Sequence, residues 1–150
     1  MFAATRSVAI DRSFELNFEH RPRYLYVAVW GPENSYAIAR EYWRRTVALL
    51  RRRHYDRVLI DKDFHQPLRT AEAFRLVSEL AHSQCHARIA VVERPYDEEH
   101  ARFEQLVGMN RGLQIAIFPD IRQAEAWLLV GTDTADPTRT LGKPYAIVNA

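Results

Sequence analysis

The sequence lacks several features that would place it in a specialised class of protein. Its single cysteine, Cys85, excludes a disulfide framework within the chain. It has no run of about 18 apolar residues and no apolar signal-peptide core near its N-terminus, so we expect a cytoplasmic protein with no membrane span. With only five glycines it has no glycine-rich phosphate loop, which disfavours dinucleotide binding of the usual kind.

What the chain does contain is typical of a globular domain. It has 150 residues, of which 47% are hydrophobic and 27% are charged. The net charge of +2 is too small to indicate nucleic-acid binding by itself. The densest basic cluster runs from Arg44 to Arg57, and the arginine face from Arg40 to Arg57 that contains this cluster has no exposed aromatic series interleaved with it. We therefore interpret this cluster as a solvated helix face, and nucleic acid is disfavoured as a partner.

Hydrophobic periodicity predicts the first elements. Alternating residues indicate strands at 14–18 and 24–30, joined by a short connection. After Ser35 the period becomes that of a helix. Its inward stripe contains Tyr36, Ala39, Trp43, Val47 and Leu50.

Three further strands are predicted from uninterrupted apolar runs at 57–61, 87–93 and 113–118. A helix should follow each of them. We expect Ala73, Phe74, Val77, Leu80 and Ala81 to mark the inner side of the second helix. The third helix should start near Asp97 with Phe103, Leu106 and Val107 facing inward, and it should end at a left-handed Gly112. Asp120 is the expected N-cap of the last helix.

The resulting order, ββαβαβαβα, predicts an α/β fold with a mixed, mostly parallel sheet and helices packed on it. This domain should cover residues 1–130. Residues 131–150 form a distinct C-terminal tail whose apolar stretch Tyr145–Val148 should dock. The docking partner is either the same domain or a second subunit, which would make a homodimer.

Residues after the strand at 57–61 are the first candidates for function. Asp61, Asp63 and His65 should lie in a loop at the carboxyl end of the sheet, where open α/β folds bind ligands. They could hold a divalent cation or supply a general base, or they could simply accept backbone hydrogen bonds in a turn. Thr70 has the position of a helix N-cap. A phosphate on Thr70 would gain from the positive helix end and from Arg69.

Two other groups of residues are candidates for ligand binding. His82, Cys85 and His86 have metal-binding side chains within about one helical turn, but no partner cluster exists elsewhere in the sequence, so neither a metal nor another cofactor is indicated. Trp30, Tyr36 and Trp43 could line a pocket between the first helix and the sheet, although aromatic residues also serve as plain core.

The stretch from about Phe14 to Leu129 resembles the STAS superfamily, and in particular its small stand-alone bacterial SpoIIAA-like branch. The resemblance rests on "VLIDKD", "RIAVVE", "NRG" before "LQIAIF", and "FPDIRQAEAWL". It implies a βαβ architecture, which lipid-transfer domains of the CRAL-TRIO type share. In partner-switching members, a serine or threonine at the start of the helix after "VLID" is phosphorylated by a kinase that the protein otherwise binds. By position this residue corresponds to Thr70, whose flanks are "LRTAEAF".

Three hypotheses about function follow. The first is a non-enzymatic cytosolic regulatory or protein-interaction module that binds a protein partner near Thr70. The second is a carrier of a small apolar molecule or lipid, with its pocket between the first helix and the sheet. The third is an enzyme that uses Asp61, Asp63 and His65.

Overall fold

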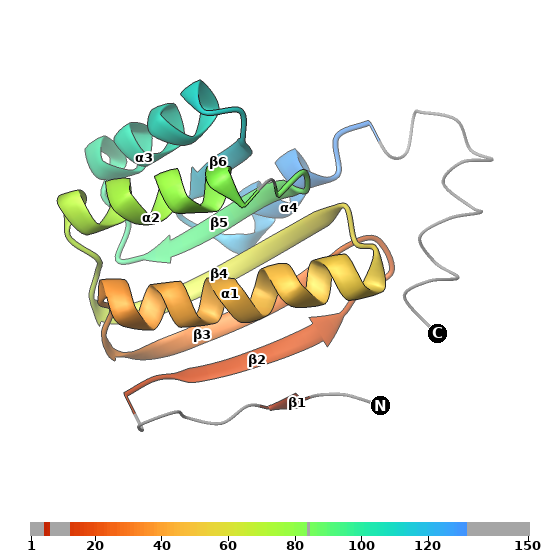
Figure 1. Ribbon diagram of the computed structural model, residues 1–150, viewed down its shortest axis with the longest axis horizontal. Helices are drawn as coiled ribbons and strands as arrows, with labels where there is room; N and C mark the ends of the chain where they lie inside the picture. Colours follow the sequence, from red (N-terminus) through yellow and green to blue (C-terminus); the bar gives the residue numbers. More distant parts are fainter. Residues whose placement is uncertain (1–4, 7–12, 84, 132–150) are drawn as a thin grey trace.

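The computed structural model describes residues 5–6, 13–83 and 85–131 of the chain. Strands and helices alternate along most of this length (Figure 1). The strands are β1 (Thr5–Arg6), β2 (Glu15–His20), β3 (Leu25–Glu33), β4 (Arg57–Gln66), β5 (Arg88–Arg94) and β6 (Gln114–Phe118). The helices are α1 (Tyr36–Arg53), α2 (Thr70–His82), α3 (Glu98–Asn110) and α4 (Ile121–Leu128).

The strands form one sheet in the order in which they occur in the chain, β1-β2-β3-β4-β5-β6. β1, β2 and β3 pair antiparallel, whereas β3, β4, β5 and β6 pair parallel. The predicted mixed, mostly parallel sheet is therefore confirmed. Because each parallel crossover is right-handed and moves in the same direction along the sheet, the crossover helices share one face.

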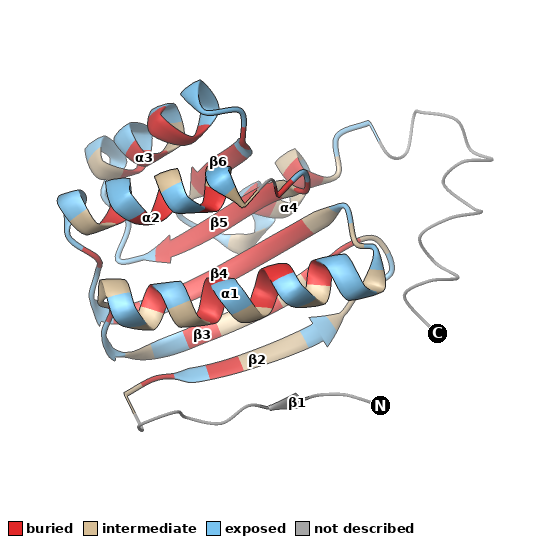
Figure 2. Cartoon of the chain, in the orientation of Figure 1, coloured by how far each residue is buried: buried red, intermediate tan, exposed pale blue. Residues whose placement is uncertain are grey.

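Two layers of helix enclose the sheet. α1, α2 and α3 cover one face, and α4 lies behind the other face, against β4, β5 and β6 (Figure 1). The larger core lies under the three crossover helices, and a smaller core lies under α4, as the buried residues in Figure 2 indicate. The fully buried side chains of the strands include Leu25, Val27, Val29, Val58, Leu59, Ile60, Ile89 and Val92.

β4 is longer than the sequence predicted. The expectation that it ends at Asp61 and passes into a loop is wrong, because pairing with β3 continues to Gln66. Along this strand the side chains alternate between the two cores: Ile60 and Phe64 belong to the larger core, whereas Leu59 belongs to the smaller one. This alternation decides which polar residues of β4 face the helices.

The caps of the helices agree in part with the sequence. Asp97 and Asp120 accept backbone hydrogen bonds at the starts of α3 and α4, and Gly112 has a φ of 91° just after α3. Thr70 differs from expectation. It is the first residue of α2, while Arg69 occupies the N-cap position and makes no side-chain cap hydrogen bond.

The inner sides of α2 and α3 also differ from expectation. Phe74, Phe103 and Leu106 were predicted to face inward, but their exposed fractions are 40%, 39% and 56%. Val107 is buried as predicted, and it shares the buried side of α3 with Ala101, Glu104 and Gly108. The sequence pattern selected the more apolar side of this helix, whereas the side that packs on the sheet contains a carboxyl group.

Among the described residues, none of the helices combines the length and the apolarity needed to cross a membrane. The expectation that the C-terminal tail docks through Tyr145–Val148 concerns residues that lie outside the described part of the chain.

Candidate functional site

Two neighbouring strands carry side chains of opposite charge that are buried near the carboxyl edge of the sheet. Lys62 of β4 and Glu93 of β5 are paired in the parallel register. Both side chains are buried, and Nζ of Lys62 lies 2.9 Å from Oε2 of Glu93. Because alternation turns Lys62 to the side of Ile60 and Phe64, this ion pair lies under the helices.

α3 adds two more polar side chains to this ion pair. His100 and Glu104 are four residues apart and therefore lie on one side of the helix. Asp97 fixes the start of α3 by accepting from the backbone amides of Glu99 and His100. Glu104 is only 4% exposed, whereas the side chain of His100 is 15% exposed and reaches the surface.

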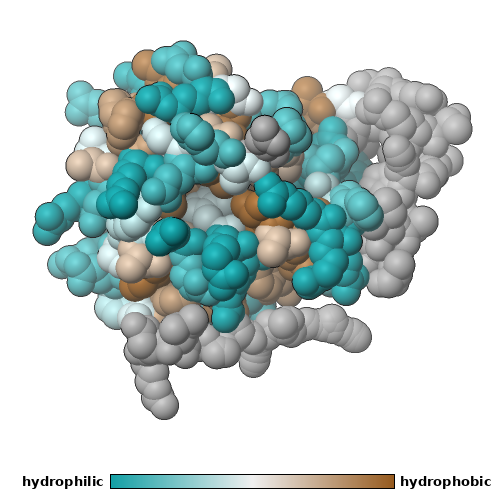
Figure 3. All heavy atoms as spheres, in the orientation of Figure 1, coloured by the Kyte–Doolittle hydropathy of each residue, from teal (hydrophilic) through white to brown (hydrophobic). Residues whose placement is uncertain are grey.

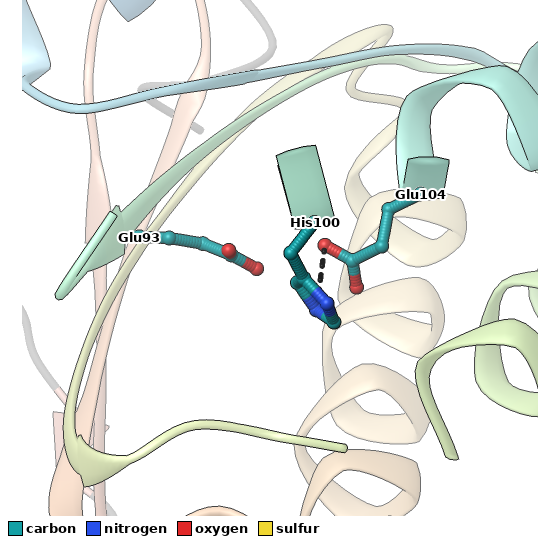
Figure 4. A group of neighbouring side chains, drawn as sticks. All are labelled: Glu93, His100 and Glu104. Carbon is teal, nitrogen blue, oxygen red and sulfur yellow. Dashed lines mark ion pairs between the residues drawn. The ribbon is translucent and has the colours of Figure 1, made fainter. Parts of the chain in front are cut away.

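The four residues Lys62, Glu93, His100 and Glu104 form what we call the buried charge cluster. Nε2 of His100 lies 3.8 Å from Oε1 of Glu104. In Figure 4 the carboxyl groups of Glu93 and Glu104 and the imidazole of His100 point toward one another. One oxygen or nitrogen atom from each of these three residues lies within 4.8 Å of the others.

The cluster balances its charge by holding a proton. Burial raises the pKa of Glu104 to about 8, and the nearby negative charge of Glu93 acts in the same direction. Burial opposes ionisation of Glu93 as well, but Lys62 and a hydrogen bond from Glu104 outweigh it and lower the pKa of Glu93. At neutral pH the protonated Glu104 therefore donates to the Glu93 carboxylate, and Lys62 neutralises that carboxylate.

Lys62 remains charged despite its burial. Desolvation alone would lower its pKa, but the negative charge of Glu93 and the influence of Tyr42 and Glu104 raise the pKa above its usual range. Tyr42 is fully buried, and its hydroxyl accepts a hydrogen bond from Nδ2 of Asn34 at 3.1 Å. A polar layer thus continues from the cluster toward the residue that follows β3.

One atom of the cluster has no hydrogen-bond partner. Oε1 of Glu104 is buried and unpaired within the described part of the chain. A cavity of about 20 Å³ is lined by Lys62 and Glu104 together with apolar residues of α1, α2, β5 and β6. This volume is that of roughly one small polar group or ion. The cavity adjoins the cluster on the side of Lys62 and Glu104.

The first predicted candidates do not belong to this cluster. Asp61, Asp63 and His65 lie on β4 itself and face the side of the sheet that α4 partly covers. Asp61 is buried, accepts a 2.7 Å hydrogen bond from the hydroxyl of Tyr26 and lies 3.4 Å from a guanidinium nitrogen of Arg94. Asp63 and His65 are exposed.

Thr70 and Arg69 are exposed at the start of α2. The hydroxyl of Thr70 lies 3.4 Å from Nδ1 of His100, so the predicted switch residue borders the buried charge cluster. Arg69 has no side-chain hydrogen bond to the helix start. Thr70 therefore lies beside His100, and the sequence did not indicate which buried side chains lie next to it.

The three residues of the predicted pocket are not brought together. Trp30 is 44% exposed, and its side chain lies on the face of the sheet opposite to α1. Trp43 is buried between α1 and the sheet. The hydroxyl of Tyr36 donates a 2.5 Å hydrogen bond to Glu79 on the outside of the molecule. No pocket lined by all three residues exists in the described structure.

A groove lies between α1 and α2 rather than between α1 and the sheet. Its volume is about 310 Å³, and Figure 3 shows apolar atoms between hydrophilic ones over these two helices. The groove has apolar walls and several arginines at its border. Its lining includes Arg40, Trp43, Arg44, Val47, Arg51, Leu76 and Leu80.

Another surface feature lies on α2 and α3. Four large apolar side chains are exposed there, with exposed fractions between 39% and 56%. The rings of Phe74 and Phe103 are 6.4 Å apart, and the guanidinium of Arg111 lies 5.0 Å from the centre of the Phe74 ring. We call these four side chains the α2–α3 patch: Phe74, Phe103, Leu106 and Met109.

Sequence reasoning missed Lys62, Glu93, His100 and Glu104. One signal was present: Lys62 interrupts an apolar strand, and a buried position for a lysine requires a nearby carboxylate. A second signal was the spacing of His100 and Glu104 on one helix. The register that brings Glu93 beside Lys62 is a property of the tertiary structure.

The fold and the site define an α/β protein with a mixed sheet, three crossover helices on one face and a polar cluster at the carboxyl edge. No protein-family model and no curated protein sequence matches the chain. One similar solved structure is that of an uncharacterized protein from the DUF3478 family, from Shewanella loihica PV-4, described as having a SpoIIAA-like fold. It shares 17% identity with a TM-score of 0.50, covering 85% of this chain and 98% of that chain.

The chain is thus a SpoIIAA-like protein in its fold. The SpoIIAA-like fold, which the strand and helix motifs indicated, is confirmed. A sequence identity of 17% supports a shared fold and no shared function.

Proposed function

We propose that the protein is a non-enzymatic regulatory module that binds a protein partner through the α2–α3 patch and the adjacent start of α2. The observation that carries the proposal is the exposure of Phe74, Phe103, Leu106 and Met109 on two neighbouring helices. Large apolar side chains gathered on a surface are typical of protein interfaces. Their cost in water is offset when a partner covers them.

The charges beside the α2–α3 patch favour a particular kind of partner. Arg69 and Arg111 are exposed, and Arg111 stacks near Phe74. A partner with an apolar contact flanked by carboxylates would complement this surface. Thr70 lies next to Arg69, so a phosphate on its hydroxyl would change the charge at the border of the same surface.

The test is affinity capture from the host with quantitative comparison of variants. Leu106→Glu places a charge in the α2–α3 patch, while Val130→Glu makes the same kind of change at another apolar residue, which is 63% exposed. We expect a specific partner that Leu106→Glu loses and Val130→Glu retains. Equal capture by both variants, or capture of only further copies of this chain, would contradict the proposal.

The part played by Thr70 is tested separately in the same assay. Thr70→Glu imitates the negative charge of a phosphate, and Thr70→Ala removes the hydroxyl. We expect Thr70→Glu to change the amount of the captured partner more than Thr70→Ala does. If both variants capture the partner as the wild type does, Thr70 is not a switch.

A second function, the binding of a small apolar molecule or lipid, is favoured by the groove between α1 and α2. Its apolar walls and bordering arginines suit a molecule with an apolar body and an anionic end. Native and denaturing mass spectrometry of protein purified from its host should then differ by one ligand mass. Identical masses under both conditions, together with no extractable molecule, would contradict the binding of a small apolar molecule or lipid.

A further inference from the structure

We propose that Glu93, His100 and Glu104 bind a divalent transition-metal ion, such as Zn²⁺ or Mn²⁺. Each residue offers one ligand atom, and these atoms all lie within 4.8 Å of one another. Two carboxylates and an imidazole are ligand types that such ions accept in proteins. This site is separate from the α2–α3 patch and goes beyond the proposed interaction function.

The secondary structure supplies the ligands in a suitable arrangement. His100 and Glu104 lie one helical turn apart on α3, and Glu93 comes from β5 across the gap between helix and sheet (Figure 4). Two ligand atoms bound to one tetrahedral ion lie about 3.4 Å apart. Nε2 of His100 and Oε1 of Glu104 are 3.8 Å apart, so this pair needs a shift of a few tenths of an ångström, and the Glu93 ligand atom lies within 4.8 Å of both.

A second observation points to a ligand at this position. Glu104 is 4% exposed, its Oε1 has no hydrogen-bond partner, and its carboxyl group points toward His100 (Figure 4). An unpaired oxygen in a protein interior loses its hydration without compensation. A metal ion between His100 and Glu104 would provide that compensation.

Neighbouring residues hold the ligands in place. Lys62 contacts Oε2 of Glu93 at 2.9 Å, which fixes the orientation of the carboxylate. The hydroxyl of Thr70 lies near Nδ1 of His100, so that Nε2 is the nitrogen that faces Glu104. The ammonium of Lys62 repels a cation, but binding of the ion would release the proton of Glu104, and the two carboxylates together would then outweigh the single charge of Lys62. Lys62 and Thr70 are thus positioning residues.

An ion would reach the site from the exposed edge of the molecule. The side chain of His100 is 15% exposed, and Thr70 beside it is exposed. The apolar residues around Glu104 close the opposite side. His100 is therefore the ligand that an entering ion meets first.

The test is titration of the chelator-treated wild-type protein with Zn²⁺ by calorimetry, and with Co²⁺ by visible absorption. We expect one ion per chain, an increase in the melting temperature and the absorption bands of Co²⁺ bound to protein ligands. His100→Gln and Glu104→Gln should each weaken binding by more than about 100-fold, since even residues that only orient a ligand contribute about 10- to 100-fold.

The variants are chosen so that loss of folding is not mistaken for loss of the site. The amide of Gln at position 104 can donate to Glu93 as the protonated carboxyl group does, so this variant should fold. His65→Gln and His82→Gln remove exposed histidines elsewhere and serve as controls that should bind as the wild type does. Circular dichroism without metal should give the same spectrum for all four variants.

Two results would overturn the proposal. One is the absence of stoichiometric Zn²⁺ and Co²⁺ binding by the wild-type protein. The other is binding that His65→Gln or His82→Gln weakens while His100→Gln and Glu104→Gln do not, because the ions would then occupy surface histidines. Either result would leave the cluster as a proton-sharing ion pair and would leave the proposed interaction function untouched.

Discussion

Lys62 is a charged side chain in a strand that otherwise reads as apolar core. Its ammonium group is buried and depends on Glu93 for compensation, at 2.9 Å. The neighbours on either side, Asp61 and Asp63, face the other surface of the sheet and cannot supply that compensation. Single residues in β4 therefore have different roles although they adjoin one another.

Replacing Lys62 tests this dependence. We expect Lys62→Met to lower the free energy of unfolding by about 3 to 5 kcal/mol, because Glu93 would remain buried without its counter-charge. Lys62→Met with Glu93→Gln should recover part of the loss. Urea denaturation measures both effects.

The matched control is Arg102→Met. This change breaks an ion pair with Glu98 in which both side chains are exposed, and such pairs contribute only about 0 to 1 kcal/mol. Equal losses in the free energy of unfolding for Lys62→Met and Arg102→Met would show that Glu93 does not depend on Lys62 for compensation of its charge.

Tyr24 gives a prediction for alkaline pH. Its burial, followed by its hydrogen bond to Glu125, raises its pKa to about 12 from a usual value of 10.0. Between these two values the unfolded chain loses the phenolic proton while the folded protein keeps it. Stability should therefore fall as the pH rises from 10 to 12.

The Tyr24 contribution is measured by comparing the wild type with Tyr24→Phe in urea denaturation at several pH values. The variant should lose stability less steeply over this range, although it lacks the 2.7 Å hydrogen bond to Glu125. Parallel curves for the two proteins would mean that Tyr24 ionises normally in the fold.

At the scale of elements, α3 is the helix whose position creates the site. Gly108 allows α3 to approach β6 closely, since a Cβ atom at this position would lie 2.6 Å from Cγ2 of Ile115. The same approach brings His100 and Glu104 over Glu93. The composition of one helix face thus sets the distance between helix and sheet.

Gly108→Ala should lower stability by up to about 2 kcal/mol. Alanine gains about 1 kcal/mol of helix propensity, but overpacking against the buried Ile115 costs about 1 to 3 kcal/mol, and Ile115 is held by the core. Thermal denaturation measures the balance. Met109→Ala, on the exposed side of the same helix, should change stability by less than about 0.5 kcal/mol. A more stable Gly108→Ala protein would contradict the close approach.

At the scale of the whole molecule, two sheet faces are used differently. The face under α1, α2 and α3 carries the larger core and the buried charge cluster. The face toward α4 carries the smaller core, with Asp61, Tyr26 and Arg94 in contact. The α2–α3 patch lies on the outer surface of the first layer, which separates the proposed partner surface from the proposed metal site.

The C-terminal tail gives a prediction at this scale. An apolar stretch such as Tyr145–Val148 would be exposed to water if it did not dock. We therefore expect removal of the residues from Asp133 onward to change either the melting temperature or the molecular mass. Docking on the same domain predicts a lower melting temperature, and docking on a second subunit predicts a halved molecular mass. Unchanged melting temperature and unchanged mass in light scattering would show that the tail does not dock.

The alternation of strands and helices, the mostly parallel sheet and the starts of two helices could be predicted from the sequence. These follow from local periodicity and from short-range hydrogen bonds, as at Asp97 and Asp120. Information of this kind is contained in neighbouring residues.

Only the tertiary structure decided which residues form the site. Lys62 meets Glu93 because β4 and β5 pair in one particular register, and Glu104 joins them because α3 buries its less apolar side. The exposure of Phe103 and Leu106 is the other consequence of that orientation. The buried carboxyl groups of Glu93 and Glu104 are compensated by Lys62 from another strand, and local periodicity contains no information about a partner so distant in the chain.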